Sequence, residues 1–298
     1  MREQGLRSTP RPSEPPSRRV GGICIHAIDA GLQRLDGGAM FGVVPKPLWE
    51  RRMPPDARNR IPLALRCLLI EAPGALVLVD TGVGNKEDDK FKEIYGVENE
   101  GSPTRLEDGI RAAGFQPEDI DLVVLTHLHF DHVGGGTLLG KEGSPEPSFP
   151  GARYVVQRGE LEFSKSRNER LRASYVARNV DAVTQAELWE LAEGDELVTE
   201  GVRLLRTPGH TPHHQCVLVE SDGETACYLA DVCPTTAHVS LPWIMGYDLE
   251  PLVTLETKRH LWQKARDQEW LLIFEHDPKL AWGYLEEDLR SIRAAEDD

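Results

Sequence analysis

One short segment of the chain is rich in side chains that bind metal ions. It reads Thr126-His127-Leu128-His129-Phe130-Asp131-His132, so three histidines and one aspartate stand within six residues. For a chain with ten histidines in 298 residues, this H-x-H-x-D-H pattern arises by chance in about one of a thousand chains. Neutral imidazole and carboxylate groups are suitable ligands for Zn²⁺ or another first-row divalent ion. The segment therefore predicts a metal site.

More ligands of the same types follow apolar runs elsewhere in the chain. One six-residue segment cannot supply all the ligands of a two-metal site, so a dinuclear centre needs such additions. The candidates are His210 after Thr207-Pro208-Gly209, Asp231 after Leu229-Ala230, and His276 after Phe274-Glu275. Chains that leave the edge of a sheet can direct several side chains to one point. The sequence is therefore compatible with a site for one ion and with a site for two ions.

The elements that position these residues are predicted mainly as short strands. Apolar runs bounded by turn-forming residues predict strands over 23–28, 63–71, 75–80, 121–126 and 153–157, and then over 188–191, 196–198, 202–206, 215–220, 225–229 and 271–275. Helical patterns cover 102–113, most of 159–186, 250–266 and 284–295. The Asp222-Gly223 pair predicts a tight hairpin turn.

Strands in two groups, with helices between and after them, predict an α/β protein. The expected architecture is an αββα sandwich, in which two packed mixed sheets are flanked by helices. Residues 20–298 are expected to form this single domain. A helical insertion at about 141–186 is expected to shape the entrance to the site. Residues 1–19, with five Arg and four Pro, are expected to form a disordered basic tail.

The charge balance and apolar content narrow the classes of function. The 34 Lys and Arg residues and 49 Asp and Glu residues give a net charge of −15, which disfavours a nucleic-acid partner. No apolar run approaches the roughly 20 residues that cross a bilayer, so we expect no membrane partner. Residues 1–19 lack the apolar core of a secretion signal, and the five Cys residues include no C-x-x-C pair. A cytoplasmic protein with reduced thiols is expected.

Five sequence blocks, in order along the chain, carry a resemblance to a known family. They are Val79-Asp80-Thr81-Gly82, the H-x-H-x-D-H segment, Pro208-Gly209-His210, Asp231 and His276. On these blocks the chain resembles the metallo-β-lactamase superfamily of metallohydrolases. Within that superfamily it is most similar to quorum-quenching N-acyl-homoserine lactonases, on residues 37–42, 127–135, 168–170, 237–238, 243 and 247–248. The resemblance implies a metal-dependent hydrolase of the lactonase or esterase type.

The resemblance also implies a role for each candidate ligand. His127, His129 and His210 would hold one ion, Asp131, His132 and His276 would hold a second, and Asp231 would bridge them. Zn²⁺ is the favoured metal, with Mn²⁺, Co²⁺ and iron as alternatives. A hydroxide shared by the ions would attack a small-molecule lactone or ester, because metal ions lower the pKa of bound water to about 7. Asp131 and Asp231 are thus the expected catalytic carboxylates, and Asp131 would orient the hydroxide and move its proton.

Five further residues are predicted around the metals. Asp80 is expected to brace a loop or a ligating histidine by hydrogen bonding. The aromatic residues Phe41, Phe130 and Trp243 are candidates for an acyl-chain pocket, with core packing as an equal alternative. In many such lactonases a Tyr stands three residues after the bridging Asp, where this chain has Pro234. His238 is the predicted replacement, as a hydrogen-bond donor to the substrate carbonyl.

Other reactions stay open for the same motif. A phosphotriesterase of the methyl-parathion-hydrolase kind or a thioesterase like glyoxalase II would use a similar metal pair. A persulfide dioxygenase would instead bind a single iron with a similar histidine block, so the number and kind of metal ions separate it from a hydrolase. A non-catalytic binding protein of the same fold is disfavoured by the complete ligand set. The oligomeric state is also open, with a homodimer among the alternatives.

Overall fold

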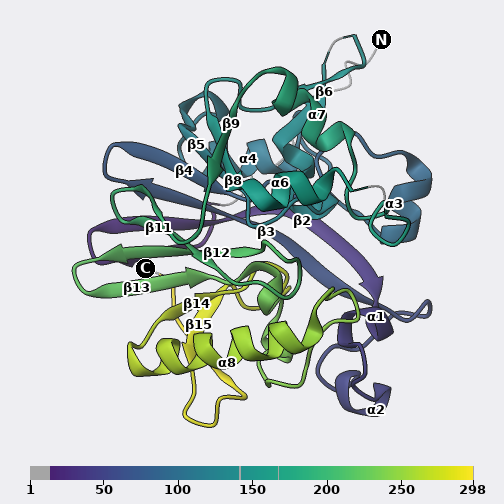
Figure 1. Ribbon diagram of the computed structural model, residues 1–298, viewed down its shortest axis with the longest axis vertical. Coiled ribbons are helices and arrows are strands. Elements are labelled where there is room, and N and C mark those ends of the chain that lie inside the picture. The colour runs from purple at the N-terminus through teal and green to yellow at the C-terminus, as the bar shows by residue number, and fades with distance from the viewer. Residues whose placement is uncertain (1–13, 141, 167, 298) are drawn as a thin grey trace, which may run out of the picture.

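Two seven-stranded sheets pack face to face at the centre of the molecule (Figure 1). The computed structural model describes residues 14–140, 142–166 and 168–297. The first sheet has the order β1 (Ser17–Val20), β2 (Ile23–Asp36), β3 (Arg60–Ala72), β4 (Ala75–Val79), β5 (Leu122–Val124), β8 (Arg153–Gln157) and β9 (Trp189–Ala192). The second has the order β10 (Leu197–Thr199), β11 (Val202–Arg206), β12 (Gln215–Ser221), β13 (Glu224–Tyr228), β14 (Leu271–Ile273), β15 (Trp282–Leu285) and β16 (Ile292–Ala294). Strands β6 (Thr137–Leu139) and β7 (Pro145–Pro147) form a small separate sheet.

Both large sheets mix parallel and antiparallel pairs. Strands β1 to β4 are antiparallel neighbours, whereas β4, β5, β8 and β9 run parallel. In the second sheet β13 and β14 are parallel, and the remaining pairs are antiparallel. Because parallel neighbours end at the same edge, β4 and β5 deliver Asp80 and Thr126 side by side, and the Thr126 backbone N–H donates to Asp80 Oδ1 over 2.8 Å. The predicted mixed sheets are confirmed.

The packing of the central strands explains why they read as continuous apolar runs. Val79 of β4 and Val124 of β5 lie in the core between the sheets, together with Tyr228 of β13. Leu78, the alternate residue of β4, packs on the opposite face in a cluster with Ile110 of α4 (Arg105–Ala112). Since both faces of these strands are covered, apolar side chains are favoured at every position.

Helices cover both outer faces of the sandwich. The helices in the described part of the chain are α1 (Gly37–Phe41), α2 (Lys46–Trp49), α3 (Asp89–Tyr95), α4, α5 (Phe130–Val133), α6 (Arg158–Ser164), α7 (Arg178–Gln185) and α8 (Pro251–Asp267), with 3₁₀ turns at Pro117–Asp119, Gly134–Gly136, Ala230–Val232 and Thr236–His238. Side chains of α4, α6 and α7 pack on the first sheet, and Trp262 of α8 packs on the second. Figure 1 shows α8 lying along the outside of the second sheet. The predicted αββα architecture is confirmed.

The predicted C-terminal helix over 284–295 is wrong, because this segment forms the β15–β16 hairpin. The carboxylate of Asp288 accepts hydrogen bonds from the backbone N–H groups of Arg290 and Ser291, over 2.8 and 3.0 Å. These bonds reverse the chain, and β15 then adds to β14. A local turn of this kind outweighs a helical pattern when a neighbouring strand is available.

Other predicted boundaries also shift. The segment 159–186 contains α6 and α7 joined by turns, rather than mainly helix, and β8 of the first sheet lies inside the predicted insertion at 141–186. The helix predicted from Ser102 begins at Arg105, because Thr104 Oγ1 caps the backbone N–H of Glu107. Of the disordered tail predicted over 1–19, residues 1–13 lie outside the described residues, and the prediction is wrong for residues 17–19, which belong to β1 and pair with β2. The Asp222-Gly223 turn is confirmed, with φ of 50° and 83°.

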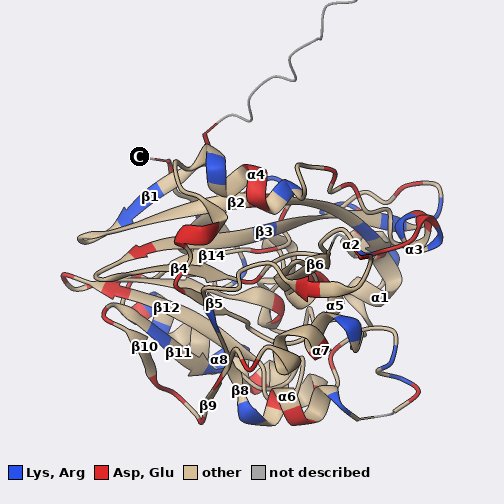
Figure 2. Cartoon of the chain, turned by 90° about the horizontal axis from the view of Figure 1, so that it is seen from above, with Lys and Arg blue, Asp and Glu red and all other residues tan. Residues whose placement is uncertain are grey.

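Charged residues are mixed over the surface. Figure 2 shows Lys and Arg interspersed with Asp and Glu on the outer helices and loops and on several strands, such as β1. Among the described residues, no helix combines the length and apolar character that a membrane span requires.

Replacing Trp262 tests the packing of α8 on the second sheet. Trp262 is 1% exposed, and its indole N–H donates to Val239 O over 2.7 Å. We expect Trp262→Ala to lower the free energy of unfolding by about 3–5 kcal/mol, because it leaves a cavity and an unpaired carbonyl. Urea denaturation measures the change. The control Leu252→Ala, at a position 77% exposed on the same helix, should change it by less than about 0.5 kcal/mol; equal effects would contradict the packing.

Candidate metal centre

The seven predicted metal ligands converge where strands of both sheets end. They are His127 and His129 on the loop after β5, Asp131 and His132 in α5, His210 after β11, Asp231 after β13 and His276 after β14. All seven side chains are buried. The backbone is strained at Asp80, directly after β4, and at Ala230, directly before Asp231, since these non-glycine residues have φ of 56° and 45°. Strained positions of this kind cluster at functional sites.

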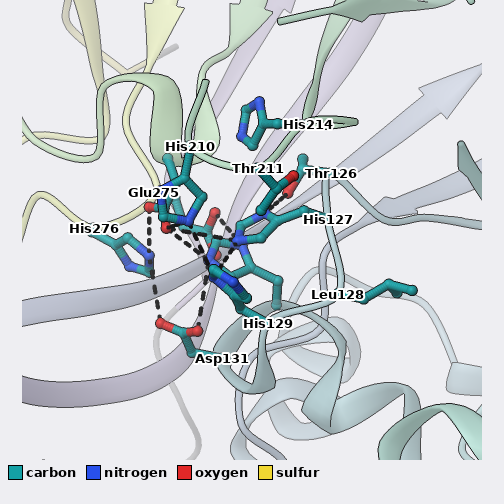
Figure 3. Close-up of polar contacts among 12 residues, drawn as sticks. Thr126, His127, Leu128, His129, Asp131, His210, Thr211, His214, Glu275 and His276 are labelled. Atoms are coloured by element: carbon teal, nitrogen blue, oxygen red, sulfur yellow. Dashed lines mark hydrogen bonds and ion pairs between the residues drawn. The ribbon is translucent and has the colours of Figure 1, made fainter. Parts of the chain in front are cut away.

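Four of these side chains, three histidines and Asp231, form a first cluster, and Figure 3 shows the histidines His127, His129 and His210 gathered together. His127 Nε2 lies 3.0 Å from His129 Nδ1, which lies 3.1 Å from His210 Nε2. Asp231 Oδ2 lies 3.0 Å from His210 Nε2 and 3.7 Å from His127 Nε2. Three imidazole nitrogens and one carboxylate oxygen facing a common point match the ligand set that Zn²⁺ takes in proteins.

The remaining three side chains form a second cluster, which Asp231 joins to the first. Asp131 Oδ1 lies 3.8 Å from His132 Nε2, and Asp131 Oδ2 lies 3.8 Å from His276 Nε2. Asp231 Oδ1 lies 3.3 Å from His276 Nε2, and its Oδ2 lies 3.5 Å from His132 Nε2. The Asp231 carboxylate therefore contacts histidines of both clusters at once.

Unpaired polar atoms indicate that these clusters fit cations. His132 Nε2 and Asp231 Oδ1 are buried, and neither forms a hydrogen bond within the described part of the chain. A buried polar atom without a partner costs about 1–3 kcal/mol, and a divalent ion between such atoms would remove that cost. The donor set of imidazoles and carboxylates suits first-row divalent metals.

Hydrogen bonds on the far side fix the imidazole rings. The second nitrogen of each of three rings is held, His132 Nδ1 by Asp80 Oδ2 at 3.0 Å, His210 Nδ1 by Asp248 Oδ1 at 2.9 Å and His276 Nδ1 by Ala64 O at 2.7 Å. Asp80 also accepts from the Thr126 hydroxyl over 2.7 Å. Such partners fix the orientation of a ligating imidazole and increase its basicity. Asp80 thus lies within hydrogen-bond distance of His132, and its role in bracing a metal ligand stays a prediction.

The charges of the site shift the pKa values of its histidines in opposite directions. Burial and the neighbouring imidazoles hold the pKa of His127 and His129 well below the usual histidine value. Burial also acts to lower the pKa of His210, but the Asp231 and Asp248 carboxylates outweigh it and raise the pKa to about 10. For His276, Glu275 and Asp231 outweigh burial and raise the pKa to about 9. The carboxylates therefore attract positive charge, which metal ions would supply in place of protons.

Three supporting residues were missed by the sequence analysis. The amide of Gln33 donates to Asp131 Oδ2, and Glu275 Oε2 lies 3.1 Å from His132 Nδ1. The buried carboxylate of Glu160 accepts hydrogen bonds from the backbone N–H of Leu128 over 3.1 Å and from the Thr211 hydroxyl over 2.9 Å. Glu160 therefore ties the loop of the first two histidines to the loop of His210. Of these three residues, only Glu275 could have been found from the sequence, because it directly precedes the predicted ligand His276.

A cavity of about 370 Å³ opens above the two clusters and is called the central cavity here. Its walls include His129, Asp131, His210, Asp231 and His276 from the two clusters. The other walls are largely apolar, formed by Leu35, Ala39, Met40, Leu63, Phe130, Leu171, Ala173, Met245, Gly246 and Leu249, with Tyr95, Tyr247, Arg170 and Ser174 as polar groups. A polar, charged floor below apolar walls is typical of sites for small, partly apolar ligands.

The aromatic residues predicted for the substrate pocket occupy different places. Phe130 lines the central cavity. Phe41 is instead buried between Trp49 and His238, with the His238 ring stacked on it at 4.4 Å between centroids. Trp243 packs edge-on against Phe41 and does not line the cavity.

The predicted role of His238 as a donor to the substrate carbonyl is corrected. His238 is buried, and its two ring nitrogens bond to Met40 O and Thr235 Oγ1, each over 2.8 Å. Both polar atoms are therefore used within the protein. Closeness to Asp231 in sequence did not determine the direction of this side chain.

Comparison with known families and proteins gives a consistent result. The sequence model of the Metallo-beta-lactamase superfamily matches residues 61–276. The N-acyl homoserine lactonase of Bacillus cereus is 28% identical over 229 residues, which cover 74% of this chain and 83% of that protein. The N-acyl homoserine lactonase of Bacillus thuringiensis is 25% identical over 222 residues, covering 72% and 82%.

Solved structures share the fold over almost the whole chain. A probable metal-dependent hydrolase from Staphylococcus aureus is 30% identical, with a TM-score of 0.87, and the match covers 94% of this chain and 99% of that one. The dizinc quorum-quenching lactonase AidC, in complex with the product N-hexanoyl-L-homoserine, is 18% identical with a TM-score of 0.76, over 96% and 98% of the two chains. At that identity the second likeness shows the fold alone.

Replacing Asp80 tests the support of His132. We expect Asp80→Asn to weaken metal binding by about 10–100-fold, because the amide cannot hold the His132 ring as the carboxylate does. Competition with a coloured chelator measures the affinity, and circular dichroism checks the fold. Asp121→Asn is the control, since Asp121 accepts a hydrogen bond from the backbone N–H of Leu76 in the same sheet and belongs to neither cluster. Unchanged affinity in Asp80→Asn would show that the ring needs no such support.

Proposed function

Because the chain belongs to the metallo-beta-lactamase superfamily, we propose that it is a hydrolase with two divalent metal ions that opens N-acyl-homoserine lactones or related lactones and esters. Its homologues are metal-dependent hydrolases. The observation that carries the proposal is the pair of ligand clusters joined by Asp231 on the floor of the central cavity. When bound, two divalent ions, with Zn²⁺ favoured over Mn²⁺, Co²⁺ or iron, supply Lewis acidity and lower the pKa of water to near neutrality.

Asp131 is the residue best placed to move a proton. Its carboxylate lies on the cavity floor, and the Gln33 amide donates to its Oδ2. Gln33 thereby fixes the carboxylate and leaves Oδ1 facing His132. From this position Asp131 can accept a proton from the attacking water and return it to the leaving oxygen of the substrate.

The walls of the cavity support a substrate with an apolar part. Leu35, Met40 and Leu171 line it with apolar side chains, so an acyl chain would displace water there and gain about 25 cal/mol for each Å² of apolar surface buried. Leu171 and its neighbour Arg170 belong to the predicted insertion at 141–186. We therefore propose that this segment shapes the substrate entrance of a single domain, residues 20–298.

Two tyrosines can orient the substrate in place of the Tyr that many such lactonases have three residues after the bridging Asp, where this chain has Pro234. Tyr95 and Tyr247 both line the central cavity. Burial raises the pKa of Tyr247 to about 12, so its hydroxyl stays protonated near neutral pH and can donate to a carbonyl oxygen. We propose that these hydroxyls bind the substrate carbonyl or amide.

The remaining features of the proposal concern setting and partners. The partner is a small molecule, since the net charge of −15 opposes binding to nucleic acid. The four Cys residues at 67, 216, 227 and 233 are buried free thiols, which supports a reducing compartment such as the cytoplasm. A homodimer is compatible with these features.

A substrate panel combined with metal analysis tests the proposed function. We expect two equivalents of divalent metal per chain and turnover of homoserine lactones in preference to a phosphotriester and a thioester. His127→Ala and Asp231→Asn should each lower kcat/KM on the order of a thousandfold or more, because several kcal/mol of charge stabilisation is lost. His260→Ala, an exposed histidine on α8, is the matched control. A single ferrous ion with oxygen consumption, or cleavage of only thioesters or phosphotriesters, would reject the lactonase.

Conservative replacement of the two tyrosines tests their role in orientation. We expect Tyr247→Phe and Tyr95→Phe each to lower kcat/KM for a lactone by about five- to tenfold, the value of one hydrogen bond of about 1 kcal/mol. Steady-state kinetics measures the change, and metal content should stay the same. Tyr284→Phe, in the second sheet and away from the central cavity, should have no effect. If both cavity variants match the wild type, the substrate is held by other groups.

A further inference from the structure

Three side chains with metal-binding groups gather at a second place, on the outer face of the first sheet. They are Cys24 and His26 of β2 and Glu71 of β3. None of them lines the central cavity. Their possible ligand atoms all lie within 4.8 Å of one another.

The sheet itself places these three residues together. Cys24 and His26 are two positions apart in one strand, so both side chains point to the same face. Glu71 lies directly opposite Cys24 in the register of β2 and β3. Since β2 has a hydrogen-bonded neighbour on each side, the backbone holds the three Cβ atoms in fixed positions without a contribution from a ligand.

The distances suit a tetrahedral ion. Cys24 Sγ lies 3.7 Å from His26 Nε2, which lies 2.8 Å from Glu71 Oε1. With Zn–S of about 2.3 Å and Zn–N of about 2.05 Å, tetrahedral zinc separates its sulfur and nitrogen ligands by about 3.6 Å. The nitrogen-to-oxygen distance would have to open by about half an ångström. The Glu71 side chain, which is 43% exposed, has the freedom to make that movement.

The environment of the cluster matches the needs of such an ion. The His26 side chain is 12% exposed, and the Phe115 ring lies edge-on to it at 6.1 Å between centroids, which limits its rotation. Arg19 lies opposite Cys24 in the register of β1 and β2. A thiolate and a carboxylate carry two negative charges, which a divalent ion neutralises.

We infer that Cys24, His26 and Glu71 form a metal site separate from the central one, which takes one divalent ion of the Zn²⁺ class with water as the fourth ligand. Sulfur as a ligand favours Zn²⁺ or Cd²⁺ over Mg²⁺ or Ca²⁺. The ion replaces the proton of the Cys24 thiol, which leaves to solvent. It also links β2 to β3 at a distance from the catalytic chemistry.

Cadmium is a suitable probe, because a thiolate bound to Cd²⁺ absorbs in the ultraviolet and the central site has no cysteine among its predicted ligands. Full-length, zinc-loaded protein is desalted and titrated with Cd²⁺. We expect a thiolate band that saturates at one Cd²⁺ per chain and is absent in Cys24→Ser. His26→Ala and Glu71→Gln should raise the apparent Kd at least about tenfold. Cys216→Ser, which removes a buried thiol, should leave the band intact.

A second readout uses the reactivity of the thiol. Cys24 is partly exposed, whereas the other four cysteines are buried, so one thiol should react rapidly with iodoacetamide and Zn²⁺ should slow that reaction. No saturable band, a band that persists in Cys24→Ser, or no protection by Zn²⁺ would overturn the site. Lactone hydrolysis should be unchanged in Cys24→Ser, so failure of this site and failure of the proposed function give different results.

Discussion

The contact of one carboxylate with two groups of histidines is the interaction on which the structure depends. Asp231 lies within 3.0–3.7 Å of nitrogens from His127, His132, His210 and His276, and its side chain is almost fully buried. A buried charge is costly unless it is matched by opposite charge or by metal. The surrounding residues are therefore organised to keep imidazoles and carboxylates together at one point, where divalent ions can balance them.

The scaffold meets this need with hydrogen bonds to ring nitrogens that face away from the two clusters. The hydrogen bonds of Asp80, Asp248 and the Ala64 carbonyl fix three imidazole rings, and Glu160 joins the two histidine loops. Glu160 itself is buried, and burial raises its pKa, whereas the hydrogen bonds from Leu128, Thr211 and the Tyr175 hydroxyl stabilise its charged form. The precise placement of the ligands thus rests on polar groups that never reach the cavity.

Features that depend on residues close together in the sequence were predictable, whereas features that depend on residues far apart in the sequence were not. The H-x-H-x-D-H segment and the strand ends at His210, Asp231 and His276 are local patterns, and the structure brings all of them together. Gln33 and Asp131 are 98 positions apart, and no spacing rule connects them. The error at 284–295 has a similar cause, because pairing with β14 decided the outcome. His238 was misassigned because the direction of its side chain depends on Met40, which is distant in sequence.

The chain crosses from the first sheet to the second once, between β9 and β10. His127, His129, Asp131 and His132 precede that crossing, whereas His210, Asp231 and His276 follow it. Each cluster contains side chains from before and from after that crossing, so neither half of the polypeptide contains all the ligands of a cluster. During biosynthesis, the complete ligand set of either cluster can therefore assemble only after the later half of the chain has been made and has docked on the earlier half.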